Sequence, residues 1–84
     1  MAQKKDYQNH NPIVGTNLKR LRKERDLKAM DVVAQLQTRS VDMTTIQYSH
    51  VENGRNNPSV DLLRALTDIF QCDYNEFFKD LSEE

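Results

Sequence analysis

The stretch TTIQYSHVENGRNNPS (residues 44–59) has the composition of a short helix followed by a polar loop. Thr44 offers a hydroxyl that can cap a helix N-terminus, and Tyr48 and Val51 lie three residues apart, on one face of a helix. Gly54 suits the left-handed conformation in which many helices end. The pattern therefore predicts a helix that starts after Thr44 and ends just before Gly54, followed by a basic, amide-rich loop.

Two helical patterns precede this stretch. Asn11 followed by Pro12 is a favourable helix start, because the amide can cap free N–H groups and a proline at the first position loses no hydrogen bond. That helix is expected to run to about residue 25, and a second is expected over residues 29–37, although Lys28 stands where a capping Ser or Thr is usual. The expected inward side chains are Val14, Leu18, Leu21 and Arg25 in the first helix and Met30, Val33 and Leu36 in the second.

Two more helical patterns follow the quoted stretch. Ser59 can cap a helix that reaches Phe70, and Asp73 with Glu76 three residues later resembles a capping box that opens a fifth helix. No run alternates between apolar and polar residues as a half-buried strand does. The predicted fold class is therefore all-α, a compact five-helix bundle. The expected inward side chains are Val60, Leu63, Leu66 and Phe70 in the fourth helix and Phe77, Phe78 and Leu81 in the fifth.

The length of 84 residues allows one small domain. Residues 1–10 are polar without apolar periodicity, so we expect a disordered N-terminal arm, then a folded domain over residues 11–81 and an acidic C-terminal end at residues 82–84. No apolar run approaches the roughly 18 residues of a membrane span, and the first residues lack the apolar core of a secretory signal. The single Cys72 cannot form an internal disulfide. A cytoplasmic protein without membrane association is expected.

Charge is distributed unevenly along the chain, although its net value is only −1. Residues 1–58 hold ten Lys or Arg and six Asp or Glu, whereas residues 59–84 hold two and seven. The expected first helix and the turn after it carry six of the positive charges, which would attract phosphates unless they are ordinary solvated side chains. These residues are Lys19, Arg20, Arg22, Lys23, Arg25 and Lys28.

The sequence offers little from which to build an active site. His10 lies in the expected arm, His50 lies on a helix, and Cys72 occupies an apolar position that favours a small core residue over a nucleophile. No His or Cys spacing suits zinc, and with two glycines the chain has no phosphate-binding glycine loop. We therefore expect no enzymatic activity, no metal or other cofactor and no small-molecule ligand.

The order of the short helices is that of a helix-turn-helix: a basic helix, a short helix, a connector over residues 38–43, and a helix with short polar side chains outside. The second helix of such a motif enters the major groove of DNA and reads base edges near its N-terminus. Because Tyr48 and Val51 face inward, five residues of the helix expected over residues 45–53 point outward. These are Thr45, Ile46, Gln47, Ser49 and His50.

The runs NLKRLRKERDLKAMDVVAQL (residues 17–36), IQYSHVENGRNNPSVDLLRALTDIF (residues 46–70) and DYNEFF (residues 73–78) resemble the phage-repressor-like helix-turn-helix family of Xre or Cro/repressor type. The most specific elements are the phrase LR-x-ER, the V-E-N-G end of the third helix and the N-P-S start of the fourth. The resemblance implies a lambda-repressor-like DNA-binding domain, double-stranded DNA as partner, and a role as a transcriptional regulator, most typically a repressor.

The resemblance also assigns roles to particular positions. Arg22 and Glu52 match an arginine and a glutamate that form a structural ion pair in this family, between the first helix and the recognition helix. Thr45, Ile46 and His50 match positions that usually face bases, with Gln47 and Ser49 beside them as base or phosphate contacts. Arg55, Asn56 and Asn57 match a loop that commonly touches the sugar-phosphate backbone.

Individual side chains leave alternatives open. Gln47 is either a reader, for which adenine is the best bidentate partner, or simply exposed. Ile46 either packs against the connector or contacts a thymine methyl group, and His50 either donates to DNA or is solvated. Tyr48 is favoured as a core residue whose hydroxyl reaches a polar group.

The chain departs from the family pattern at two places. The connector is about five residues longer than in compact members, as in one branch of the family, and Arg39 on it is a candidate for a phosphate contact beside Thr44 at the start of the next helix. The second helix normally opens with a hydroxyl cap and a glutamine that holds a phosphate. Lys28 and Ala29 stand there instead, leaving a point charge and backbone N–H groups as phosphate contacts.

A two-fold operator would require two linked domains, so a homodimer is expected. Phe78 and Leu81 near the acidic end are the candidate dimer surface, whereas Phe77 is favoured as part of the monomer's own core. The alternative function is a protein-interaction module, antitoxin-like or an adaptor, with weak or no specific DNA binding. The net charge of −1 and Ala29 favour that alternative, whereas the basic first helix and the asparagine-rich loop favour DNA.

Overall fold

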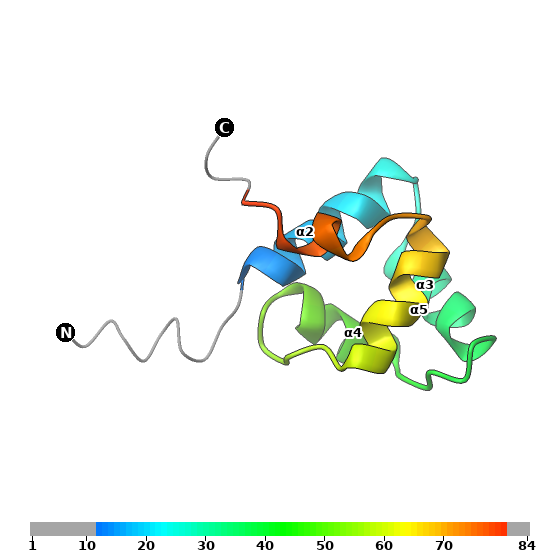
Figure 1. Cartoon of the computed structure of the whole chain (residues 1–84). Coiled ribbons are helices and arrows are strands. Elements are labelled where there is room, and N and C mark those ends of the chain that lie inside the picture. Colours follow the sequence, from blue (N-terminus) through cyan, green and yellow to red (C-terminus); the bar gives the residue numbers. More distant parts are fainter. Residues whose placement is uncertain (1–11, 81–84) are drawn as a thin grey trace.

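Four α-helices and one short 3-10 helix follow one another along residues 12–80, the part of the chain that this computed structural model describes (Figure 1). They are α2 (Pro12–Glu24), α3 (Ala29–Gln37), α4 (Thr45–Glu52), α5 (Val60–Phe70) and the 3-10 helix η1 (Tyr74–Phe78). The all-α class is confirmed. The expected arm and the helix cap at Asn11 lie outside the described residues. Within residues 12–80, no helix has both the length and the apolarity to cross a membrane.

Local side-chain chemistry accounts for where the helices start and end. The Ser59 hydroxyl accepts a hydrogen bond from the Leu62 N–H at 3.1 Å and caps α5. Before α3, the Asp31 carboxylate accepts from the Lys28 backbone N–H at 2.8 Å, although the Lys28 side chain itself can accept nothing. Gly54 follows α4 with φ of 80°, as expected for a left-handed stop.

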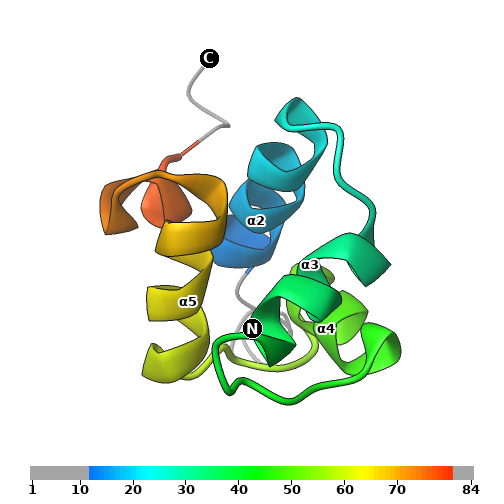
Figure 2. The ribbon, with the colours of Figure 1, turned by 90° about the vertical axis from the view of Figure 1, so that its right-hand side faces the viewer.

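Helix α2 packs against α4 and η1, α3 packs against α4 and α5, and η1 also contacts α5, so the core lies between all five elements (Figure 2). Its largest fully buried side chains come from every element and include three aromatic rings. Phe77 of η1 is one of them, which confirms its assignment to the monomer's own core. The set comprises Tyr48, Phe70, Phe77, Leu18, Leu21, Leu36, Leu66, Val32 and Asn17.

In α3 and α5 the first residue of the predicted inward stripe is exposed, whereas the rest of each stripe faces inward as predicted. Leu36, Leu66 and Phe70 are buried, and Val33 and Leu63 are partly buried against the core. Met30 is 63% exposed and Val32 is fully buried, while in α5 Val60 is 71% exposed and Leu62 is buried. In each helix an apolar residue two positions further on is covered instead, and the neighbouring helices decide which one. The predictions that Met30 and Val60 point inward were wrong.

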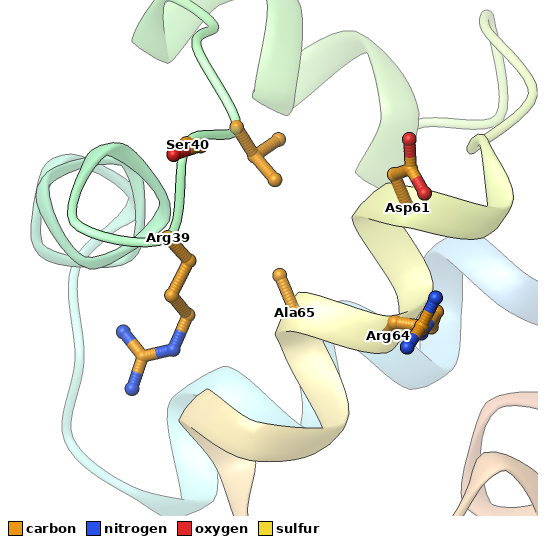
Figure 3. Close-up of a pocket in the computed structure, with 6 residues that line it drawn as sticks. Arg39, Ser40, Asp61, Arg64 and Ala65 are labelled. Atoms are coloured by element: carbon orange, nitrogen blue, oxygen red, sulfur yellow. The ribbon is translucent and has the colours of Figure 1, made fainter.

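The C-terminal end of α3 is joined to α5 by Arg39. Its Nε donates to Asp68 Oδ2 at 2.7 Å, and its NH1 donates to the backbone oxygen and the side-chain oxygen of Gln35 at 2.9 and 3.0 Å. Figure 3 shows Arg39 on one side of a surface pocket, with Asp61, Arg64 and Ala65 of α5 on the other. Arg39 therefore helps to hold the connector against α5.

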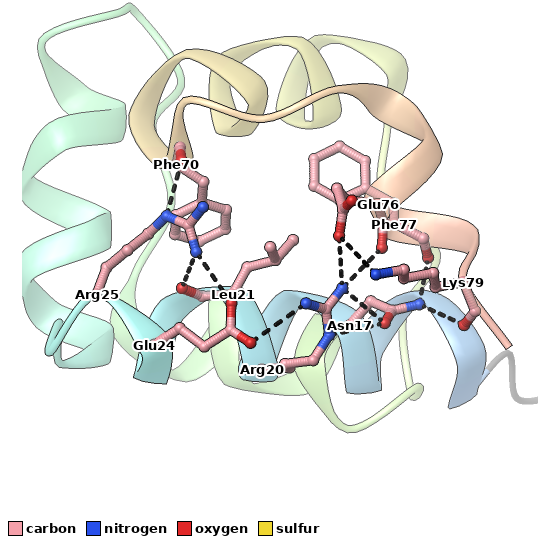
Figure 4. A network of polar contacts seen from close by, with 9 residues as sticks. All are labelled: Asn17, Arg20, Leu21, Glu24, Arg25, Phe70, Glu76, Phe77 and Lys79. Carbon is pink, nitrogen blue, oxygen red and sulfur yellow. Dashed lines mark hydrogen bonds and ion pairs between the residues drawn. The ribbon is translucent and has the colours of Figure 1, made fainter. Parts of the chain in front are cut away.

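The predicted fifth α-helix is a 3-10 helix of five residues, and the Asp73 side chain makes no capping hydrogen bond. Instead, Asn17 of α2 donates from its amide to the carbonyl oxygens of Phe77 and Lys79, at 3.0 and 2.8 Å (Figure 4). These bonds provide partners for carbonyl groups at the C-terminal end of η1, where Lys79 is already in an extended conformation. Leu81 lies outside the described residues.

Glu76 does not form the expected capping box but pairs with Arg20 of α2, NH2 to Oε1, at 3.0 Å (Figure 4). The Arg20 guanidinium, which donates this hydrogen bond, lowers the pKa of Glu76 below its ordinary value, and Lys79 at 3.6 Å adds to the effect. A carboxylate whose pKa is lower in the folded chain stabilises that state above its unfolded pKa and loses the effect as pH falls through the folded pKa.

This pair predicts an acid-dependent loss of stability. Between about pH 6 and pH 3, the urea midpoint of unfolding should fall less for Glu76→Gln than for the parent chain, because the variant has no carboxylate to protonate. Asp42→Asn is the matched control, since Asp42 is exposed and forms no ion pair within residues 12–80. Identical pH profiles for Glu76→Gln and the parent would contradict the proposed role of the pair.

Candidate nucleic-acid interface

Helices α3 and α4 pack against each other and are joined by residues 38–44 (Figure 2). Within this connector Ser40 is in the left-handed conformation, at φ 64°, and the Val41 N–H donates back to the Leu36 carbonyl at 3.0 Å. Val41 and Met43 are half-buried and pack against the core. The connector is thereby anchored to the core at two points.

The outer face of α4 carries the five residues predicted as base contacts. Thr45, Ile46 and Gln47 are exposed in its first turn, while Ser49 and His50 are half-buried. Tyr48, Val51 and Glu52 occupy the opposite, buried stripe. Ile46 does not pack against the connector, since it is 69% exposed.

Thr44 and Gln47 form a reciprocal capping box at the start of α4. The Thr44 hydroxyl accepts from the Gln47 N–H at 3.0 Å, and the Gln47 side-chain oxygen accepts from the Thr44 N–H at 2.9 Å. This arrangement satisfies two N–H groups that the helix itself leaves without partners. Gln47 therefore presents its Nε2 donor outward while its oxygen is bound to the helix start.

The loop after α4 continues the same region of the surface. Arg55, Asn56 and Asn57 are all exposed, and the backbone N–H groups of Arg55 and Asn56 both donate to the His50 carbonyl, at 2.9 and 3.3 Å. The loop is therefore tied to the C-terminal end of α4. Among the N-terminal residues of α3, Lys28 is exposed and Ala29 is half-buried against the core.

An ion pair between Arg22 and Glu52 connects α2 to α4. Arg22 Nε and NH2 donate to the two carboxylate oxygens at 2.8 and 3.0 Å, and NH1 donates to the Leu27 carbonyl at 2.9 Å. The side chains are 12% and 5% exposed, and the hydrogen bond to Glu52 raises the pKa of Arg22. Planar, two-point pairing of this kind fixes the relative orientation of the two helices.

Tyr48 lies beside this ion pair, in the core. Its side chain is fully buried, and burial, together with the neighbouring Glu52 carboxylate, raises the pKa of its hydroxyl. The hydroxyl therefore lies near the polar pair of Arg22 and Glu52, but it has no partner in hydrogen-bonding geometry within residues 12–80. The ring fills the core, and the hydroxyl takes no part in the exposed face of α4.

Arg20 of α2 and Arg25, which directly follows α2, also bind within the protein (Figure 4). Arg20 contacts Asn17 and Glu76, while Arg25 donates to the Phe70 carbonyl at 2.7 Å and lies 5.8 Å from the centre of the Phe70 ring. With Arg22, these side chains connect α2 to η1, α5 and α4. The three arginines of the basic run are thus mainly structural. The expectation that all six positive charges attract phosphate does not hold for Arg20, Arg22 and Arg25.

Asn17 and Gly15 were not recognised from the sequence as structural residues. Asn17 is fully buried, and a Cβ on Gly15 would collide with the carbonyl oxygen of Glu52, so α2 and α4 touch there backbone to backbone. The sequence does contain a signal for Asn17, because it is a polar residue inside the apolar stripe of Val14, Leu18 and Leu21. An amide buried there needs hydrogen-bond partners, which marks it as a structural residue. Nothing in the sequence marks Gly15, because its neighbour is 37 residues away.

A family model described as helix-turn-helix domain matches residues 13–77, which is most of the chain. The chain belongs to this helix-turn-helix family. Its membership indicates DNA binding and transcription regulation, and such domains are typically not enzymes. No curated protein and no solved structure matches the sequence. Within the described residues of this helix-turn-helix protein, no group of three or more His, Cys, Asp or Glu side chains is placed to hold a metal ion.

Proposed function

We propose that this helix-turn-helix protein binds double-stranded DNA sequence-specifically and represses transcription, as a member of the phage-repressor-like branch with an extended turn. The observation that carries the proposal is the exposed face of α4, where Thr45, Ile46, Ser49 and His50 lie outside the core and continue into a loop tied to the His50 carbonyl. A helix in the major groove presents this kind of surface. A domain bound there excludes other proteins from the same DNA, which is a direct route to repression.

The phosphate contacts in this proposal come from both ends of the helix-turn-helix. Lys28 and the backbone of Ala29 serve at the start of α3, and the Thr44 hydroxyl, which accepts within the capping box, still has its hydrogen to donate. Arg55, Asn56 and Asn57 serve in the loop after α4. Arg39 is omitted, because its guanidinium is engaged with Asp68 and Gln35.

A homodimer in the cytoplasm completes the proposal. An operator with two-fold symmetry needs two domains related by the same symmetry. Phe78 is 55% exposed and Tyr74 is 46% exposed on η1, so this short helix offers the apolar surface for the contact. Leu81, the other residue expected in the dimer surface, lies outside the described residues.

A protein-interaction module remains the second candidate, and one observation favours it. Because Arg20, Arg22 and Arg25 bind Glu76, Glu52 and the end of α5, the cations left for phosphate in the proposed contact set are Lys28 and Arg55. With so few, the electrostatic part of DNA affinity is small. Sequence-specific contacts from α4 must then supply much of the binding.

Selection of bound duplexes from a random DNA pool, followed by titration at several salt concentrations, tests the proposal. A palindromic consensus is expected, with log K falling against log salt with a slope of about −2 per domain, because two cations contact phosphate. Recovery of no consensus would contradict sequence-specific binding and favour the interaction module.

Single variants test which arginines face DNA. Arg55→Ala should reduce the magnitude of the salt slope by about 1 per domain, and Arg39→Ala should leave it unchanged. Arg39→Ala is the matched control, since it removes the same charge from a side chain that is held by Asp68. A smaller slope for Arg39→Ala would mean that Arg39 leaves Asp68 to contact phosphate.

A further inference from the structure

The capping box limits what Gln47 can read. A glutamine recognises adenine by accepting from N6 with its side-chain oxygen while its Nε2 donates to N7. In this protein the oxygen accepts from the Thr44 N–H at 2.9 Å, so the amide is folded back on the start of its own helix. Bidentate contact with adenine would have to use the second lone pair of this same oxygen, so the capping box restricts the direction from which a base can approach.

Ile46, the residue before Gln47, has an apolar side chain that lies largely in solvent. It is 69% exposed, and on a helix it shares one stripe with the residues three and four positions further on, Ser49 and His50. An aliphatic side chain thus lies beside two groups that can form hydrogen bonds. In the major groove the one apolar group on a base edge is the 5-methyl group of thymine.

We propose that Ile46 reads a thymine through its 5-methyl group, and that Gln47 is a positioning residue that holds the first turn of α4. The proposal deepens the function proposed above and rests on it. It assigns a chemical class to the operator: each half-site carries a thymine whose methyl group packs against Ile46, next to base pairs contacted by polar groups of Ser49 and His50. The capping box makes this reading precise, because it fixes the turn that carries Ile46.

Replacement of thymine by uracil in the selected duplex tests the proposal, since it removes only the methyl group. Each thymine of the consensus is changed in turn, and binding of the parent protein is measured by fluorescence anisotropy. Loss of contact with one methyl group should weaken binding about fourfold at one position of each half-site, and about sixteenfold when both half-sites are changed.

Two variants of matched exposure assign the effect to Ile46. Ile46→Ser should bind thymine and uracil duplexes equally, whereas Val60→Ser should keep the full uracil penalty, because Val60 is an aliphatic residue of similar exposure, 71%, at the start of α5. Both side chains are largely in solvent, so neither change should alter the melting curve. A uracil penalty that persists in Ile46→Ser would overturn the assignment.

The variant Gln47→Ala tests whether Gln47 positions the first turn of α4 or recognises a base itself. It should weaken binding to all sequences alike and leave the consensus unchanged, whereas loss of preference for adenine at one position would overturn the positioning role. A clear consensus with no uracil-sensitive thymine overturns the inference about Ile46 but leaves the DNA-binding function intact. Absence of any consensus overturns both proposals.

Discussion

Arg22→Ala is expected to destabilise the fold by about 3 kcal/mol, because it leaves the Glu52 carboxylate charged and without its partner in the interior. Glu52 is only 5% exposed, and both of its oxygens accept from Arg22. For a domain of this size that loss lowers the melting temperature by about 10 °C or more. Since the net stability of so small a core is itself only about 3–5 kcal/mol, much of the variant would be unfolded at room temperature.

Thermal unfolding followed by circular dichroism measures this effect, with Lys23→Ala as the matched control. Lys23 is the next residue of α2 and is exposed, so its loss should change stability by less than about 0.5 kcal/mol. The double variant Arg22→Met with Glu52→Leu should recover much of the stability, because it leaves no buried charge without a partner. Equal melting curves for Arg22→Ala and the parent chain would show that the pair does not lock α2 to α4.

Gly15→Ala is expected to be the other severe substitution, although alanine is the better helix former. Intrinsic helix propensity favours alanine by about 1 kcal/mol. The added Cβ, however, would collide with the carbonyl oxygen of Glu52 and would lie 2.8 Å from the Val51 oxygen. These are backbone atoms of α4, which cannot rotate away as a side chain can, so α2 and α4 must separate. Overpacking of this kind costs about 1–3 kcal/mol and here exceeds the gain in propensity.

Urea unfolding measures the balance, and Thr16→Ala provides the control. Thr16 is exposed on the same helix, so its replacement should show only the small gain in helix propensity. Gly15→Ala should also weaken binding to DNA beyond the loss caused by unfolding, because separation of the helices moves α4. A variant as stable as Thr16→Ala would mean that the two backbones are not in contact at Gly15.

The amphipathic patterns located the elements because helix formation depends on nearby residues. The caps at Thr44 and Ser59, the stop at Gly54 and the apolar repeats gave helix limits that agree with α3, α4 and α5 within a residue or so. The expected fifth helix is a short 3-10 helix, η1, whose Phe77 carbonyl is bound by the Asn17 amide, 60 residues away along the chain. Local sequence contains no record of such a partner.

The exact edge of the buried face was decided by packing in α3 and α5. Leu36 is buried as its spacing predicts, but Met30 and Val32 are both acceptable apolar neighbours of it on α3, and only the positions of α4 and α5 select Val32. Packing also decides which charged side chains are available to DNA. The sequence predicts that Arg20, Arg22 and Arg25 form a phosphate-binding face, but in the structure each of them is held by a group on a distant element.

The sequence by itself determined the all-helical class, the order of the helices and the family, because periodicity, caps and short phrases such as V-E-N-G act over a few residues. The tertiary structure alone decided which polar groups of the candidate interface have intramolecular partners. Gln47 and Arg39 read as free side chains in the sequence, but the Gln47 oxygen accepts from Thr44 and the Arg39 Nε donates to Asp68. The polar groups that remain available to contact DNA depend on which distant elements lie beside them in the folded chain, and composition and spacing contain no information about those neighbours.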